Sequence, residues 1–254
     1  MISPAMNTNM FENPIVQDNL QKLQNYGFEV IQPASGYLAC GDTGAGKMPE
    51  PEVLLSYILR ELAHEKDLVG KKVLVTAGPT QEKIDPVRYI TNHSTGKMGY
   101  ALAQTAARRG AVVTLVHGMT QLPIPLGVKD SAVESAEDMF EAVKNEAEKQ
   151  DIIIKAAAVA DYTPVFVSDE KIKKQEGETA IALKRTTDIL AWLGEHKREG
   201  QFLCGFSMET ENMLENSKKK LAKKKADLIV ANNLKVELLN DGPVTICMDT
   251  KNKE

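Results

Sequence analysis

Cysteine is scarce in this sequence, and long apolar runs are missing from it. The three cysteines among 254 residues, Cys40, Cys204 and Cys247, are odd in number and widely spaced. This pattern argues against both a disulfide framework and a zinc site. No apolar stretch approaches the length of a bilayer span, and the N-terminus has no basic head followed by an apolar core. We therefore expect a cytoplasmic protein with no membrane partner.

Positive charge is not in excess either. The formal net charge is −4, and lysine runs are not interleaved with aromatic residues. Nucleic acid is therefore not an expected partner. The sequence contains no G-x-G-x-x-G and no Tyr-x-x-x-Lys pair, so a nicotinamide-dependent enzyme is a weak interpretation.

One stretch imitates a nucleotide-binding P-loop, GDTGAGKM from Gly41 to Met48. Met48 stands where the Ser/Thr that holds magnesium is required, and Pro49 interrupts the helix that should follow. No apolar strand directly precedes the stretch. We reject a P-loop here.

Residues 71 to 254 alternate between strand and helix patterns. Strands are predicted at 73–75, 111–116, 152–154, 202–206, 228–231 and 244–248, and helices at 96–109, 135–149, 188–196 and 211–225. Such alternation is typical of an α/β fold with a doubly wound (Rossmann-like) parallel sheet, which binds ligands at the carboxyl ends of its strands.

Residues 1 to 65 differ from the rest in sequence pattern and are predicted to form a separate domain. We expect a helix at 13–26, a strand at 27–31, a glycine-rich loop at 36–52 and a helix at 52–63. Residues 64–70 are a predicted connector.

The segment from Val73 to Gly110 predicts a phosphate site. A short apolar strand leads into a long polar loop, Thr76 to Thr95, and then into a helix with Met98, Leu102 and Ala106 on one face. Strand, loop and helix N-terminus present backbone N–H groups to phosphate. The alternative is an ordinary first α/β unit whose loop happens to be long.

Several side chains have residue types that suit an anionic nucleotide. Arg88 offers a planar fork and Asn92 an uncharged amide, although both would also suit a solvated loop. Asp161 follows a strand end and suits a ribose hydroxyl, a metal or a helix cap. Lys220 and Lys224 are i, i+4 neighbours that could clamp one anion, although lysines on a helix are more often a solvated face.

The stretch TAGPTQEKIDPVRYITNHSTGKMG, from Thr76 to Gly99, resembles the first motif of phosphopantothenate–cysteine ligase, a CTP-dependent enzyme family of coenzyme A biosynthesis. The resemblance extends over about residues 71 to 233, and we expect the ligase domain to occupy 71–254. It implies CTP, Mg²⁺, 4′-phosphopantothenate and cysteine as reaction partners, and a homodimer formed through this domain.

The resemblance also assigns roles to residues. Asn92 matches the asparagine that handles the acyl-cytidylate and contacts substrate, Arg88 its companion, and Lys171, in the run Lys171 to Lys174, the lysine required to form that intermediate. Ala158, assigned to substrate binding, lies in the AAAVADY segment from Ala156 to Tyr162, which lines the nucleotide site in the family. The CTP-binding positions fall on Gly78, Lys155, Ala156, Ala157, Asp161, Lys171, Thr187, Asp188, Ile189, Leu190, Phe206, Lys220 and Lys224. No residue is assigned to the metal.

The N-terminal part resembles another family. PAMNTNMF, from Pro4 to Phe11, is similar to a signature of phosphopantothenoylcysteine decarboxylase, a flavodoxin-like FMN enzyme. Asn7 matches its substrate-binding asparagine and Cys40 its general acid. The family's FMN-binding segment and catalytic histidine lie upstream of this match, so we expect residues 1–65 to be a C-terminal remnant of that domain without decarboxylase activity.

The ligase is therefore the expected function. The alternatives are a flavin-dependent decarboxylase, whose purified protein would be yellow, and a non-catalytic nucleotide-binding module of the same fold.

Overall fold

The computed structural model describes residues 1–173, 180–209, 213–233 and 245–249. The chain forms two compact units, Met1–Ala63 and His64–Glu254. No helix within the described ranges combines the length and the apolar character needed to cross a bilayer.

The first unit contains three helices and one hairpin. Its elements are α1 (Thr8–Phe11), α2 (Pro14–Asn25), β1 (Ala34–Tyr37), β2 (Thr43–Lys47) and α3 (Pro51–Leu62). The Asn13 side chain accepts a hydrogen bond from the Ile15 N–H at 2.9 Å, and Pro14 occupies the first turn. Both features favour a helix start, and they explain why the helix predicted at 13–26 is confirmed.

Two predictions for this unit are wrong. The segment predicted as a glycine-rich loop contains the antiparallel β1–β2 hairpin. The strand predicted at 27–31 is reduced to one isolated bridge between Val30 and Ile2. The hairpin was not predicted because its small residues do not alternate between apolar and polar. Its two strands pair through backbone groups, which leave no pattern in the sequence. Residues 43–47 lie in a strand, which agrees with the rejection of a P-loop.

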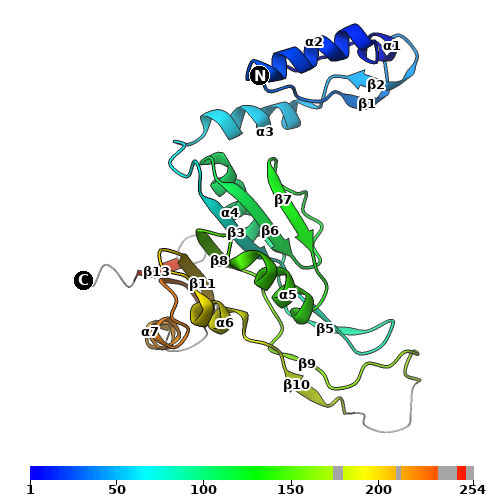
Figure 1. Cartoon of the computed structure of the whole chain (residues 1–254). Coiled ribbons are helices and arrows are strands. Elements are labelled where there is room, and N and C mark those ends of the chain that lie inside the picture. The colour runs from blue at the N-terminus through cyan, green and yellow to red at the C-terminus, as the bar shows by residue number, and fades with distance from the viewer. Residues whose placement is uncertain (174–179, 210–212, 234–244, 250–254) are drawn as a thin grey trace, which may run out of the picture. The chain divides into compact units, whose positions relative to one another are not determined.

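The second unit is built on a seven-stranded sheet in the order β13-β12-β11-β8-β3-β6-β7 (Figure 1). The strands are β3 (Lys72–Ala77), β6 (Val112–His117), β7 (Val128–Ala132), β8 (Ile152–Lys155), β11 (Phe202–Glu209), β12 (Leu228–Asn233) and β13 (Thr245–Asp249). The first six are parallel, and β13 runs antiparallel to β12. The chain winds outward from β3 in both directions, so the doubly wound parallel sheet is confirmed. Its topological switch point lies between β3 and β8.

Helices cover both faces of this sheet. The helices are α4 (Lys97–Arg108), α5 (Ala136–Ala147), α6 (Ile189–His196) and α7 (Met213–Lys223). Val73 and Val75 pack with α4 on one face, while Leu74 packs with α5 and α6 on the other. Neighbouring strand residues point to opposite faces, so β3 is buried on both. The helix predicted at 135–149 corresponds to α5, and Ser135 and Asp138, whose spacing is typical of a capping box, form one at its start.

The buried face of α4 agrees in part with the predicted one, because Ala106 is buried and Leu102 packs against the core but Met98 does not. Its buried residues are Gly99, Tyr100, Ala103, Ala106 and Ala107, whereas Met98 is 45% exposed. The small side chains let the helix lie close to the sheet, and a count of large apolar residues misses this kind of packing.

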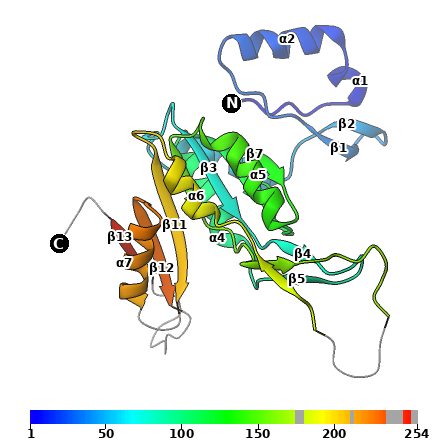
Figure 2. The ribbon, with the colours of Figure 1, turned by 60° about the horizontal axis from the view of Figure 1, so that its bottom comes forward.

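A projecting arm was not predicted. It consists of β4 (Gln81–Lys83) paired with β5 (Tyr89–Thr91), and β9 (Tyr162–Pro164) paired with β10 (Leu183–Arg185). Figure 2 shows the β4–β5 hairpin extending from the end of the sheet. The supposed loop from 76 to 95 therefore contains a hairpin. Strand β7 was also missed, and residues 211–212 and Val244 of two predicted elements lie outside the described residues.

Candidate functional site

The loops that follow β3 and β8 lie side by side at the switch point. The Ala158 N–H donates to the Gly78 carbonyl at 2.9 Å, and the Ala157 N–H donates to Thr76 Oγ1 at 3.1 Å. The Ala160 N–H donates to Thr80 Oγ1 at 3.0 Å. These bonds join the predicted phosphate loop to the AAAVADY segment, although the two are about eighty residues apart in sequence.

Gly78 occupies a position that only glycine fits. Its φ is +74°, and a Cβ placed there would lie 2.6 Å from the Thr120 Cγ2 methyl. The Thr120 hydroxyl is itself 2.7 Å from the Tyr100 hydroxyl on α4. The loop, the helix start and the segment after β6 are thus packed against one another at this point.

Asn92 reaches the same place from the end of β5. Its Nδ2 donates to the Val159 carbonyl at 3.0 Å and approaches the Ala158 carbonyl at 3.4 Å. Gly78, Asn92 and Ala158, all predicted from sequence, are brought together by these contacts.

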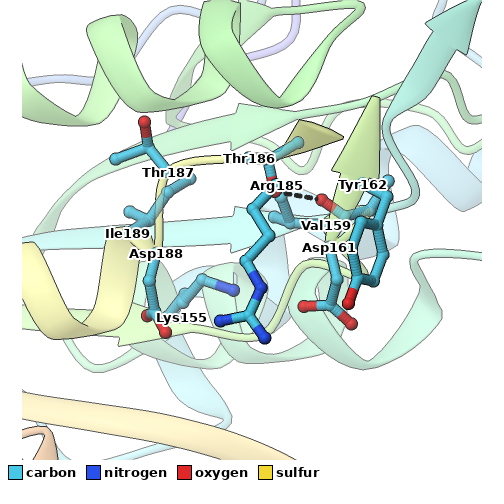
Figure 3. Close-up of a pocket in the computed structure, with 10 residues that line it drawn as sticks. Lys155, Val159, Asp161, Tyr162, Arg185, Thr186, Thr187, Asp188 and Ile189 are labelled. Carbon is cyan, nitrogen blue, oxygen red and sulfur yellow. Dashed lines mark hydrogen bonds between the residues drawn. The ribbon is translucent and has the colours of Figure 1, made fainter. Parts of the chain in front are cut away.

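A cavity of about 450 Å³ opens beside this junction. Its lining comes from the end of β8, the segment into β9, and the end of β10 through the start of α6. The lining residues are Lys155, Val159, Ala160, Asp161, Tyr162, Arg185, Thr186, Thr187, Asp188 and Ile189. In Figure 3 the charged ends of Lys155, Arg185, Asp161 and Asp188 point into one space, whereas the Thr187 hydroxyl points the other way.

Two further lysines reach this charged group from the end of α7. Lys224 forms an ion pair with Asp188, whose other oxygen accepts the Ala191 N–H at 2.9 Å and caps α6. The Lys220 ammonium donates to Ser207 Oγ, next to Phe206, at 2.8 Å. Lys155, Arg185, Lys220 and Lys224 thus bring basic side chains to the same neighbourhood as the carboxylates of Asp161 and Asp188. Lysine and arginine side chains of this kind suit an anionic ligand.

The electrostatics of Lys155 depend on this neighbourhood. Desolvation by surrounding protein atoms lowers the pKa of its ammonium, while the carboxylates of Asp188 and Asp161 oppose that shift. Desolvation acts to raise the pKa of Asp188, but the hydrogen bonds from Lys224 and the Ala191 N–H outweigh it and hold that pKa below its usual range. An anion entering the cavity would therefore favour the protonated form of Lys155.

Ile189 and Leu190 differ from the polar residues around the cavity because their side chains are buried in the core. They are 1% and 8% exposed and belong to the core against the sheet. Their contribution to a ligand would therefore come from the backbone at the start of α6. Ala156 is half-buried directly after β8, and Phe206 is half-buried within β11.

Arg88 and Lys171 lie on the arm, and neither lines the cavity. Arg88 Nε donates to Asp85 Oδ2 at 2.9 Å, and its Nη2 donates to the Ile172 carbonyl at 2.9 Å. Lys171, next to that carbonyl, is exposed. Lys174, the last residue of the predicted lysine motif, lies outside the described residues.

Sequence reasoning missed Arg185 and Thr186 as lining residues. Arg185 pairs with Tyr162, the last residue of the AAAVADY segment, between β10 and β9. Neither short strand has an apolar period, so the only signal was the proximity of Arg185 and Thr186 in sequence to Asp188. A second hollow, of about 660 Å³, is lined by Gln81, Ser94, Thr95 and residues 119–122, and it was not predicted either.

In the first unit Asn7 and Cys40 are in contact although 33 residues separate them. Asn7 Nδ2 lies 3.1 Å from Cys40 Sγ and 3.2 Å from Asp42 Oδ2. The structure thus places side by side the two residues that match the decarboxylase family, and Asp42 lies next to them.

No group of three or more His, Cys, Asp or Glu side chains suited to a metal ion occurs within the part of the chain that the structure describes. A Mg²⁺ ion arriving with a nucleotide would take most of its ligands from phosphate oxygens and water, as this ion commonly does.

Comparison with known proteins agrees with the division of the chain. Residues 68–253 match the family described as DNA/pantothenate metabolism flavoprotein C-terminal domain, and residues 1–63 match the family described as Flavoprotein. The chain is 50% identical to the coenzyme A biosynthesis bifunctional protein CoaBC of Bacillus subtilis (strain 168), over 92% of this chain and 58% of that protein. A cysteine/cysteine sulfinic acid decarboxylase from an unknown prokaryotic organism is 46% identical over 92% of this chain and 67% of its own length.

A solved structure also matches. The crystal structure of the C-terminal domain of a coenzyme A biosynthesis bifunctional protein CoaBC superposes with a TM-score of 0.62 at 47% identity, covering 73% of this chain and 85% of that one. The chain spans less than two thirds of the length of the bifunctional Bacillus relative. From the sheet topology, the paired loops at the switch point and a family match over well more than half of its length, the chain belongs to the DNA/pantothenate metabolism flavoprotein C-terminal domain family.

Proposed function

We propose that the second unit is a phosphopantothenate–cysteine ligase of coenzyme A biosynthesis that uses CTP. The observation that carries the proposal is the convergence of Lys155, Arg185, Asp161 and Asp188 on one cavity at the switch point (Figure 3). Open α/β sheets bind ligands at this place, and the lysine and arginine side chains suit the phosphates of a nucleotide. The curated relative named for coenzyme A biosynthesis supports the choice of pathway.

The chemistry explains why a nucleotide is needed. A carboxylate resists attack by an amine because it is negatively charged and oxide is a very poor leaving group. Transfer of a cytidylyl group from CTP to the carboxylate of 4′-phosphopantothenate releases pyrophosphate and forms an acyl-cytidylate. The cysteine amine then displaces CMP, a good leaving group, and the amide forms.

The residues around the cavity suit different parts of this reaction. Lys155, Lys220 and Lys224 would neutralise the phosphates, and the backbone near Gly78 and the start of α4 would add N–H donors. Asp161 would contact the nucleoside, with Phe206 beside it. Mg²⁺ bound with the nucleotide would help to neutralise the triphosphate charge.

Asn92 and Lys171 would act on the intermediate at different stages. The two carbonyls that hold the Asn92 amide nitrogen fix its side chain beside the cavity-lining Val159, where it would hold the acyl-cytidylate. Lys171 would stabilise the charge that develops as pyrophosphate departs. Because Lys171 lies on the arm, the arm would have to bring it to the nucleotide.

The apolar surface of the arm favours a homodimer as the working form. Val87, Tyr89, Val165, Phe166, Ile181 and Leu183 are all at least 44% exposed on or next to β4, β5, β9 and β10. A concentrated apolar surface of this kind is typical of a protein–protein interface. The proposed occupant is the arm of a second copy.

The decisive test is pyrophosphate release on addition of 4′-phosphopantothenate and cysteine with each nucleoside triphosphate in turn. We expect release with CTP; a chain that binds CTP without releasing pyrophosphate would be the non-catalytic module. Asn92→Asp should accumulate acyl-cytidylate, whereas Lys171→Gln should accumulate none and release pyrophosphate only at a small residual rate. Equal amounts of the intermediate in both variants would overturn the two assignments.

A second candidate function, phosphopantothenoylcysteine decarboxylase, is favoured by the Asn7–Cys40 contact in the first unit. Asn7 would bind the substrate carboxylate and Cys40 would return a proton, while bound FMN would supply the redox chemistry. The test is whether purified protein carries the visible flavin absorption and releases CO₂ from 4′-phosphopantothenoylcysteine. Colourless protein that remains inactive with added FMN would exclude this activity for the chain.

A further inference from the structure

Asp85 is a buried carboxylate in an otherwise solvent-exposed turn of the arm. It is 2% exposed, whereas its neighbours Pro86, Val87 and Arg88 are exposed. A carboxylate is costly to bury unless hydrogen-bond donors satisfy it, so its partners indicate what the burial achieves.

Those partners come from two segments that are far apart in sequence. Asp85 Oδ1 accepts the N–H groups of Val87 and Arg88, each at 2.9 Å. Asp85 Oδ2 accepts Arg88 Nε at 2.9 Å and the N–H of Ile172 at 3.2 Å. The Oδ1 bonds shape the turn, while Oδ2 reaches across to the lysine segment.

Arg88 completes the connection. Its Nη2 pairs with Asp85 and also donates to the Ile172 carbonyl at 2.9 Å. The N–H and the C=O of Ile172 are therefore both held by the Asp85–Arg88 pair. A third bond, from the Ser168 N–H to the Ile84 carbonyl at 3.0 Å, fixes the same segment a turn earlier.

These contacts restrain the backbone on the C-terminal side of Lys171 while its side chain stays exposed. We propose that Asp85 is a positioning residue for Lys171: through Arg88 and the backbone of Ile172, it holds the lysine segment in the conformation that presents Lys171 to the nucleotide. This inference rests on the ligase function proposed above and deepens it.

The contacts that link Asp85 through Arg88 to Ile172, here called the tether, suit a role that does not change with pH. The hydrogen bond from Arg88 is the strongest of several that hold the pKa of Asp85 well below its usual range, so the carboxylate stays ionised wherever the protein is folded and active. An asparagine at this position could still accept the turn N–H groups through Oδ1. Its amide nitrogen would, however, face two donors, Arg88 and the Ile172 N–H, and the connection to the lysine segment would be lost.

The simpler account is that Asp85 only stabilises the β4–β5 turn. The two accounts differ in how Asp85 and Lys171 combine. If Asp85 acts through Lys171, removing Asp85 should cost nothing further once Lys171 is gone. If it only stabilises the turn, the two losses should multiply.

The experiment uses the full chain with Asp85→Asn, Lys171→Gln and the double variant. Asp67→Asn is the matched control, since Asp67 also pairs with an arginine, Arg109, on the surface of the same unit. Single-turnover pyrophosphate release from CTP should slow about ten- to hundredfold in Asp85→Asn, the range for a lost hydrogen bond to a charged group, and hardly at all in Asp67→Asn. The double variant should be as slow as Lys171→Gln. Asp85→Glu, which restores the charge one methylene further out, should recover part of the rate.

Hydrogen exchange of the Ile172 amide separates this inference from the ligase proposal. Its exchange should accelerate at least about tenfold in Asp85→Asn while amides of β3 keep their protection, which also shows that the variant is folded. Unchanged exchange at Ile172, or multiplying losses in the double variant, would overturn the inference. If the unmodified protein released no pyrophosphate but the exchange result held, the ligase proposal would fail while the structural tether stood.

Discussion

Replacing Gly78 with alanine tests the packing of the proposed phosphate loop. At φ +74° an L-residue pays about 1–2 kcal/mol for the left-handed conformation. The new Cβ would also lie 2.6 Å from Thr120 Cγ2, an overlap that costs about 1–3 kcal/mol when a packed site must absorb it. The free energy of unfolding should therefore fall by about 2–5 kcal/mol, the sum of these two effects.

Two further variants separate the two contributions. Gly200 has φ +78°, and no atom lies within 4 Å of the point that a Cβ would occupy there, so Gly200→Ala should show the conformational cost alone. Thr120→Ser removes the methyl group but keeps the hydroxyl that faces Tyr100. In the Gly78→Ala/Thr120→Ser pair, the overlap should disappear and the loss should approach that of Gly200→Ala.

The assay can follow the second unit specifically. Trp192 is the single tryptophan of the chain and lies in α6, so its fluorescence during urea unfolding reports this unit. The reasoning would be refuted if Gly78→Ala cost no more than Gly200→Ala, or if Thr120→Ser recovered none of the loss. At low urea, where the Gly78→Ala protein is still folded, its rate of pyrophosphate release should also fall, because the loop can no longer pack as it does in the unmodified protein.

Three further predictions concern charge and assembly. The pKa of Lys155 is lowered in the free cavity and a triphosphate should raise it, so CTP binding should take up protons at pH values between the lowered pKa and the ordinary lysine value; calorimetry in buffers of different ionisation enthalpy would show the uptake, and Lys155→Met should abolish it. Lys224→Met should weaken CTP binding about tenfold by removing a charge from the cavity, whereas Lys219→Met, which breaks only an exposed pair with Glu215, should leave binding by titration calorimetry unchanged. Phe166→Glu should shift the sedimentation velocity of the protein from dimer to monomer, because it places a charge in the exposed apolar surface of the arm; an unaltered dimer would disprove that interface.

Much of the second unit could be read from sequence because its strands are apolar and its helices carry local signals. Val73–Val75 and Ile152–Ile154 are uninterrupted apolar runs, as expected for strands buried on both faces. Ser135 and Asp138 cap α5 through contacts only three residues apart, and Asp188 caps α6 in the same way. Alternation of such elements then left few possible topologies.

The candidate site was harder, because its geometry depends on contacts between distant segments. The residue types and the resemblance selected Gly78, Asn92, Asp161 and Lys171 together. The structure joins the first two to the AAAVADY segment that contains Asp161 but places Lys171 on the arm, next to the Ile172 backbone that Asp85 holds. Their catalytic roles stay predictions.

By itself the sequence determined the apolar strands of the central sheet, which loops carry glycine and which side chains can meet an anion, since each depends on chemistry within a few positions. Only the tertiary structure decided that Arg185 lines the cavity, that the Thr120 methyl group packs against Gly78, and that Asp85 holds the backbone of Ile172. The hydrogen bonds at the site and the arm join residues far apart in the chain: Asp188 and Lys224 are separated by 36 positions, and Asp85 and Ile172 by 87. No local periodicity specifies such contacts, because they exist only after the sheet has brought the strand ends together.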